Sequence, residues 1–200
     1  MSTLPRDRPL AFMDTETTGL VPGVHEVIEI AITKVCPRTG QKEFYHTLIR
    51  PEHVENAEPE ALACNSYGTD PTPWDHAPLF REVSQGILEF LKGTVIVGYH
   101  VTYDVAMING VFLQNGSTEK LKHHNLDAMA LVFEHLVPLG LTSLKMDAVR
   151  DFLGWSKEGA HHAKKDVQDL MDLYSLLNRA SWLTRLRIQF LRKLKLPVGR

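Results

Sequence analysis

Cysteine is nearly absent from this 200-residue sequence: Cys36 and Cys64 stand alone, with no Cys-x-x-Cys pair and no cluster of Cys and His. This scarcity argues against a disulfide scaffold and against a structural zinc site. The sequence also lacks an apolar run of membrane-spanning length, and residues 1–9 carry three charges but no apolar core of the kind that a signal peptide needs. We therefore expect a cytoplasmic protein with no membrane partner.

Repeats and low-complexity segments are absent too, and 44% of the residues are hydrophobic, so we expect one substantial core. The net charge of −2 excludes a uniformly basic coat for nucleic acid. The charge is uneven, because residues 179–200 contain seven Lys and Arg and no Asp or Glu, which leaves a net charge of −9 on the remainder. We expect an N-terminal extension at 1–8, a main domain at 9–180 and a basic amphipathic helix at 181–200.

Apolar and β-branched runs at residues 10–13, 27–33 and 44–49 predict an opening meander of three strands. The long segment 51–78, rich in Pro, Glu and Asn, is expected to be a functional loop. A buried strand is predicted at 94–98, and helical spacing predicts helices over residues 79–92, 101–115, 128–136, 143–153, 163–178 and 182–196. Strands that come first and then alternate with helices are typical of a three-layer α/β or α+β domain with a mixed sheet.

Two carboxylates, Asp14 and Glu16, stand two residues apart at the end of the first predicted strand, before a break at Thr18-Gly19. Side chains at i and i+2 of a strand point to the same face, so these two project together while Thr15 points away. Carboxylates this close repel each other unless a cation lies between them or one binds a proton. Their oxygen atoms suit Mg²⁺ or Mn²⁺, although an acidic strand end in solvent is the alternative.

Two further clusters lie where predicted helices begin. Asp104 falls in the first turn of the helix over 101–115, where a negative charge is also favourable for the helix by itself. His161 and Asp166 are five residues apart and converge only if His161 lies on the glycine-containing loop before the next helix. A loop histidine titrates near neutral pH and suits a general base; a solvated or capping histidine, at 161 or 162, is the alternative.

In this order, the three clusters resemble the motifs of the DnaQ-like 3′–5′ exonucleases of the DEDD superfamily, in the subclass whose fifth residue is a histidine. The family's Asp-x-Glu-Thr-Thr-Gly-Leu motif matches residues 14–20 without a mismatch. Its aromatic-Asp pair matches Tyr103-Asp104, and its His-x-Ala-x-x-Asp motif matches residues 161–166. The resemblance covers residues 10–178 and implies a ribonuclease H-like three-layer α/β fold, with a mixed five-stranded sheet flanked by helices.

The second motif departs from the family pattern. Anchoring on Asp104 puts Tyr99 and His100 where the family usually has His and Asn. Neither position is a metal ligand in the family. The departure therefore concerns local contacts with the substrate and leaves the implied chemistry intact.

The resemblance implies metal-dependent hydrolysis of phosphodiester bonds from the 3′ end of DNA, with release of nucleoside monophosphates. Asp14, Glu16, Asp104 and Asp166 would hold two divalent ions, Mg²⁺ or Mn²⁺, that stabilise the attacking and leaving oxygens. His161 would take a proton from the attacking water. These five residues are the expected catalytic set, and the four carboxylates are the expected metal ligands.

The same resemblance implies three residues that bind the substrate. Thr17, next to Glu16, would contact the terminal 3′-hydroxyl, and Leu20 would stack against the terminal base without reading its identity. The segment around Asn65 would supply a second wedge against the terminal nucleotides. The expected partners are 3′ ends of nucleic acid, above all single-stranded DNA, and a DNA polymerase.

Two other functions stay open at this point. A 3′–5′ exoribonuclease of the same fold, resembling ribonuclease T or oligoribonuclease, fits the same motifs, although the Thr-Thr after Glu16 looks more like the epsilon-type DNA-proofreading branch. A non-catalytic, polymerase-associated binding module would have lost a carboxylate, and none is lost.

The basic tail predicts one of two roles. It could bind the phosphate backbone, with an affinity that falls as salt is added, or pack its apolar stripe on the domain or on a partner. Packing is favoured because five large apolar residues share one side: Leu183, Leu186, Phe190, Leu191 and Leu194.

Overall fold

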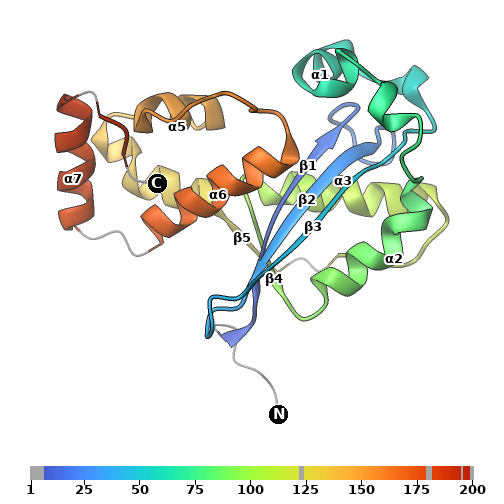
Figure 1. Ribbon diagram of the computed structural model, residues 1–200, viewed down its shortest axis with the longest axis horizontal. Helices are drawn as coiled ribbons and strands as arrows, with labels where there is room; N and C mark the ends of the chain where they lie inside the picture. The colour runs from blue at the N-terminus through green and yellow to red at the C-terminus, as the bar shows by residue number, and fades with distance from the viewer. Residues whose placement is uncertain (1–6, 122–123, 179–181, 195, 199–200) are drawn as a thin grey trace.

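The structure, a computed structural model, describes residues 7–121, 124–178, 182–194 and 196–198. Its centre is a five-stranded sheet in the order β3-β2-β1-β4-β5 (Figure 1). The antiparallel pairs β1–β2 and β2–β3 form the predicted meander, while β4 runs parallel to β1 and β5 parallel to β4. The mixed five-stranded sheet is thus confirmed. Its strands are β1 (Leu10–Thr17), β2 (Val27–Val35), β3 (Lys42–Leu48), β4 (Val95–Gly98) and β5 (Asn125–Asp127).

Helices cover both faces of this sheet. They are α1 (Pro59–Cys64), α2 (Phe80–Leu91), α3 (Val101–Gln114), α4 (Ala128–His135), α5 (Met146–Leu153), α6 (Ala163–Leu177) and α7 (Trp182–Lys193). Short 3₁₀ turns occur at η2 (Val54–Asn56), η3 (Ser66–Gly68), η4 (Thr72–Trp74) and η5 (Val137–Leu139). Within the described residues, none of these helices combines the length and the apolar character needed to cross a bilayer.

The alternation of side chains along β1 produces the three layers. Ala11 and Met13 pack into a core with Ile30 and Ile32 of β2 and with the buried faces of α2 and α3. Phe12 points to the other side, where its core is completed by residues of α6 and by Ala128 at the start of α4. Because successive side chains of a strand face opposite ways, one strand supplies both cores. The expected three-layer domain is confirmed.

A third core lies beside the sheet, where α5 and α7 sit together on the side of the molecule away from α1 and α2 (Figure 1). From α7 this core takes Ile188, which is fully buried, and Leu191. Leu186, Phe190 and Leu194 are about half exposed or more. The predicted apolar stripe is therefore wrong for Leu186, Phe190 and Leu194 and right for Leu191. The packed face is formed by Ile188 and Leu191, which are three residues apart on the helix. The predicted Leu183 side chain lies outside the described residues.

The segment 51–78 differs from the expected loop, because it contains α1 and three 3₁₀ turns. Trp74 anchors this segment: its side chain is buried, and its indole N–H donates to the carbonyl of Ile28 at 2.7 Å. β5 was not expected from the pattern. It is only three residues long, and Leu126 within it is exposed, so it leaves no apolar run to detect.

Helix α5 begins at Met146, three residues after the predicted start. The hydroxyl of Tyr99 donates to the carbonyl of Leu144, and Lys145 is extended, so this stretch is held out of the helix. The proposed division at residues 8 and 180 stays a prediction. Residues 1–6 of the predicted extension, and 181, 195 and 199–200 of the predicted terminal helix, lie outside the described residues.

Candidate active site

Three of the predicted ligands meet at the carboxyl end of β1. Asp14 and Glu16 project from the α6 side of this strand, and Asp166 reaches them from the first turn of α6. Oxygen atoms of the three carboxylates lie within 4.8 Å of one another. Within the described residues, this is the group of acidic, His or Cys side chains that could hold a metal ion. All three ligands are oxygen atoms, which fits a hard cation such as Mg²⁺ or Mn²⁺.

Burial and crowding act together on the pKa values of these carboxyl groups. Burial, followed by the charges of Asp104 and Asp166, raises the pKa of Asp14 well above its ordinary value. Burial, followed by the charges of Asp166 and Glu29, raises the pKa of Glu16 to about 8. Burial also raises the pKa of Asp166. Carboxyl groups that keep their protons for this reason would release them to a cation bound among them, so the residues fit a divalent ion.

Asp104, the fourth predicted ligand, approaches from the opposite face of β1. It is buried in the first turn of α3, where its Oδ1 accepts hydrogen bonds from the Thr15 N–H at 3.0 Å and the Thr15 hydroxyl at 2.7 Å. Burial raises the pKa of Asp104 to about 7, although these two bonds oppose the shift. Asp104 is not part of the three-carboxylate group, yet its charge acts on Asp14.

The chain enters α3 through a residue in an uncommon conformation. His100 has a φ of +63°, and its N–H donates to Asp127 Oδ1 at 2.9 Å. Asp127 also caps α4, because the same oxygen accepts the Met129 N–H. Left-handed backbone in a residue other than glycine is uncommon and gathers at functional sites. This turn fixes the start of the helix that carries Asp104.

His161 lies on the turn that precedes α6, as the loop prediction requires. It too has a φ of +63°, and its side chain is exposed. The charge of His161 acts on Asp166 and opposes the rise that burial causes in the pKa of that carboxyl. The neighbouring His162 is held elsewhere, because its Nε2 lies 2.9 Å from the hydroxyl of Ser66. The structure therefore separates the two histidines and puts His161 beside the carboxylates.

The predicted substrate-binding residues surround the end of β1. Leu20 is 66% exposed on the loop that follows the strand. Thr17 is buried, and its hydroxyl donates to the carbonyl of Gly19 at 3.0 Å, as the hydroxyl of Tyr103 does at 2.9 Å. Asn65 is buried, and its Nδ2 donates to the carbonyl of Thr17 at 3.1 Å. Leu20 thus faces solvent, whereas Thr17 and Asn65 hold the loop.

Sequence reasoning missed Glu29. This residue stands directly opposite Glu16 in the β1–β2 register, is buried, and lies 2.8 Å from His46 Nε2. Its charge raises the pKa of both Asp14 and Glu16. An acidic residue inside the apolar run of residues 27–33 was the available signal.

Sequence reasoning also missed Arg150 of α5. Its side chain is 1% exposed and forms ion pairs with Asp147, Asp166 and Asp169. The available signal was a cation four residues after Met146 and three before Leu153, on the apolar side of the predicted helix.

The described surface of the molecule includes the following two hollows. One, of about 560 Å³, has a lining that includes Glu29, His46, His162, Lys164 and Lys165 but none of the predicted site residues. The other, of about 400 Å³, lies at the opposite end of the sheet, where β4 begins, and its lining includes none of the predicted site residues.

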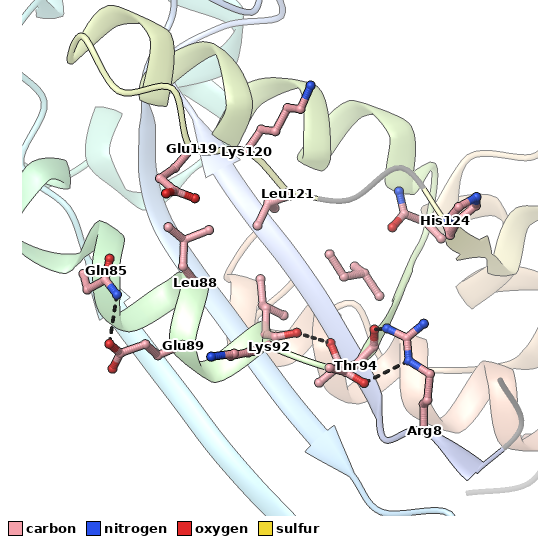
Figure 2. Close-up of a pocket in the computed structure, with 14 residues that line it drawn as sticks. Arg8, Gln85, Leu88, Glu89, Lys92, Thr94, Glu119, Lys120, Leu121 and His124 are labelled. Atoms are coloured by element: carbon pink, nitrogen blue, oxygen red, sulfur yellow. Dashed lines mark hydrogen bonds between the residues drawn. The ribbon is translucent and has the colours of Figure 1, made fainter. Parts of the chain in front are cut away.

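Figure 2 shows this second hollow. Arg8 extends to the turn before β4, where its Nε donates to the carbonyl of Gly93 at 2.9 Å. The first hollow is the nearer of the two to the carboxylates, because its lining includes Glu29, which stands opposite Glu16 in the β1–β2 register.

Comparisons with known proteins identify the family of this chain. The family model described as exonuclease, RNase_T, matches residues 11–174. The DNA polymerase III subunit epsilon of Treponema pallidum is 28% identical over 165 residues, which are 82% of this chain and 74% of that protein. The corresponding subunit of Pasteurella multocida is 30% identical over 176 residues, 81% of this chain and 65% of that protein. A PolC-type DNA polymerase III of Caldanaerobacter subterraneus is 29% identical, but the chain spans only 11% of its length.

Solved structures share the fold. Escherichia coli exonuclease I in complex with single-stranded DNA has a TM-score of 0.67 and 18% identity, over 93% of this chain and 43% of that one. The nuclease domain of 3'hExo, a DEDDh family member bound to rAMP, has a TM-score of 0.62 and 16% identity, over 96% of both chains. Because the family model spans well over half of the sequence, this chain belongs to the exonuclease family, in the DnaQ-like group to which its motifs point.

Proposed function

We propose that this protein removes nucleotides from the 3′ end of single-stranded DNA by metal-dependent hydrolysis, releasing nucleoside monophosphates. The observation that carries the proposal is the group formed by Asp14, Glu16 and Asp166, whose oxygens lie within 4.8 Å of one another. The DNA preference draws on the relatives, which are named as subunits of DNA polymerase III, and on a fold shared with an exonuclease bound to single-stranded DNA. A DNA polymerase partner and a cytoplasmic location are part of the same proposal.

The residues of the site divide the work as follows. Asp14, Glu16 and Asp166, with Asp104 behind Thr15, would hold two divalent ions, Mg²⁺ or Mn²⁺. When bound, such ions stabilise the charge on the attacking and leaving oxygens of the phosphodiester.

His161 takes the proton from the attacking water, because its imidazole stands exposed on the turn before α6, where its charge acts on Asp166. The charge of Asp166 favours the imidazolium that this step produces.

The loop after β1 would receive the end of the substrate. Leu20, Val21 and Val24 expose apolar surface next to the carboxylates, which suits stacking against a terminal base of any identity. Lys164, exposed in the first turn of α6 two residues before Asp166, would face the phosphates of the strand. Thr17 and Asn65 hold this loop in place, and Thr17 with Glu16 would contact the 3′-hydroxyl.

The test uses 5′-labelled single-stranded DNA, duplex DNA and RNA, each with Mg²⁺, Mn²⁺ or EDTA. We expect a ladder of products shortened from the 3′ end of single-stranded DNA, and no products in EDTA. Asp14→Asn should reduce the rate by at least ~10³-fold, because it removes a ligand and a charge from the group that holds the ions. Faster cleavage of RNA than of DNA would move the proposal to an exoribonuclease.

The adjacent histidine provides the matched control for the general base. His161→Ala should reduce kcat by about 10²–10⁴-fold, while His162→Ala, which removes only the contact with Ser66, should leave kcat within a few-fold. Equal losses in the two variants would refute His161 as the base. Cleavage that continues in EDTA, or in Asp14→Asn, would refute the metal-dependent mechanism.

A further inference from the structure

Arg150 is buried among three carboxylates. Its Nη1 lies 2.9 Å from Asp147, its Nη2 2.5 Å from Asp166 Oδ1 and its Nε 2.9 Å from Asp169 Oδ2. The guanidinium thus bridges from α5 to two carboxylates that stand three residues apart on α6. Asp147, by contrast, belongs to α5 itself and is half exposed. The planar fork of arginine can hold two carboxylates in a fixed direction at once, which a lysine ammonium cannot.

Charge compensation inside the fold explains only part of this arrangement. Asp169 has a second cation, because Lys165 Nζ lies 2.5 Å from the same oxygen. Asp166 has no such second ion pair within the described residues, and it is the one partner of Arg150 that belongs to the carboxylate group at β1. Buried ion pairs are in general weak sources of stability relative to apolar packing. The contact that calls for a further explanation is therefore the one with Asp166.

We propose that Arg150 is a positioning residue of the metal site: it holds Oδ1 of Asp166 and so directs the other carboxylate oxygen toward the ion shared with Asp14 and Glu16. This inference rests on one part of the proposed function, namely that Asp14, Glu16 and Asp166 together bind a divalent ion. Arg150 acts from behind Asp166 and touches neither ion nor substrate. Partners that orient metal ligands in this way typically contribute 10–100-fold to metal affinity.

The test measures metal binding directly, without nucleic acid. Isothermal titration calorimetry with Mn²⁺ should give a Kd that is about 10–100-fold higher for Arg150→Gln than for the wild type. Arg150→Lys keeps the charge but loses the fork, so its Kd should also rise, by less than in Arg150→Gln. Full restoration of affinity by lysine would overturn the positioning role, since charge alone would then be sufficient.

Two controls separate positioning from stability. Asp169→Asn keeps the contact between Arg150 and Asp166 but breaks a fully buried ion pair, so it should lower the melting temperature while the Kd for Mn²⁺ stays within a few-fold. Lys157→Gln removes a surface cation paired with Asp151 and should change neither quantity appreciably. A rise in Kd in Asp169→Asn as large as in Arg150→Gln would assign the effect to a loosened α5–α6 contact and overturn the inference.

The outcome also distinguishes this inference from the proposed function. If the wild type binds no Mn²⁺ in the titration, both are refuted. If the wild type binds Mn²⁺ and Arg150→Gln binds it equally well, only the role of Arg150 is refuted, and the carboxylate group stands as a metal site.

Discussion

Replacing Glu16 by Gln should stabilise the metal-free protein near neutral pH, although it removes a ligand of the proposed site. Burial and neighbouring charges raise the pKa of Glu16 from 4.5 to about 8 in the folded state. The native state therefore retains a proton that the unfolded state releases as the pH rises through 4.5. Because the folded pKa is the higher one, stability falls as the pH rises through this window, and the loss is complete near pH 8.

The size of the effect follows from the width of that window. Each proton that the native state holds in excess lowers the free energy of unfolding by about 1.4 kcal/mol per pH unit. Between pH 4.5 and pH 7, Glu16 accordingly removes roughly 3 kcal/mol from the stability of the metal-free protein. Glutamine has the same shape and cannot ionise, so Glu16→Gln should recover most of this amount at pH 7.

Urea denaturation in EDTA, at half-unit steps from pH 4.5 to pH 8, measures the prediction. The free energy of unfolding of the wild type should fall across the range, and the fall should be shallower in Glu16→Gln. Glu60→Gln, an exposed position on α1, is the matched control and should follow the wild type. Added Mn²⁺ should then stabilise the wild type more than Glu16→Gln, since an ion that binds only the native state shifts its stability by mass action.

The refuting result is a Glu16→Gln variant whose stability falls with pH as steeply as that of the wild type. Such a result would mean that Glu16 is ionised in the metal-free protein at neutral pH without a free-energy penalty. The carboxylates would then be less crowded in solution than in the structure, and the case for a cation among them would weaken.

Two further substitutions test how the site is held together. Thr15→Val removes one of two hydrogen bonds to the buried Asp104 and should cost about 1.5–3 kcal/mol of unfolding free energy in urea denaturation; an unchanged midpoint would contradict this role. Gly19→Ala puts a Cβ 2.5 Å from the ring of His25 and should cost about 1–3 kcal/mol in the same assay. Gly86→Ala, whose Cβ would have only ordinary contacts inside α2, should instead stabilise by about 1 kcal/mol. Equal effects at the two glycines would refute the steric reason.

The sequence allowed the centre of the site to be predicted, because its geometry is local. Alternation along one strand is enough to bring Asp14 and Glu16 together, and the group formed with Asp166 confirms it. The position of His161 was equally local, since a glycine-containing turn must end before α6 begins. The roles of these residues in catalysis stay predictions until the nuclease assay is done.

Residues that depend on long-range pairing could not be found in this way. Glu29 joins the site through the β1–β2 register, which requires knowledge of which residues face each other across two strands. Arg150 joins it through the packing of α5 against α6, and nothing in the local pattern identifies its three partners. The strand β5 was missed for a related reason: three residues carry no periodicity, and the pairing with β4 alone defines the strand.

The register of β1 determines the position of the carboxylates on both faces of this strand. Asp14 and Glu16 face α6, and Thr15 faces α3, where it holds Asp104. A slip of one residue would turn both carboxylates into the apolar core of α2 and α3 and expose Thr15 to Asp166. Met13, which has no exposed surface in that core, makes such a slip unfavourable by at least the free energy of burying one large apolar side chain, about 1.5–3 kcal/mol. The packing of the strand therefore holds together carboxylates whose mutual repulsion would otherwise separate them.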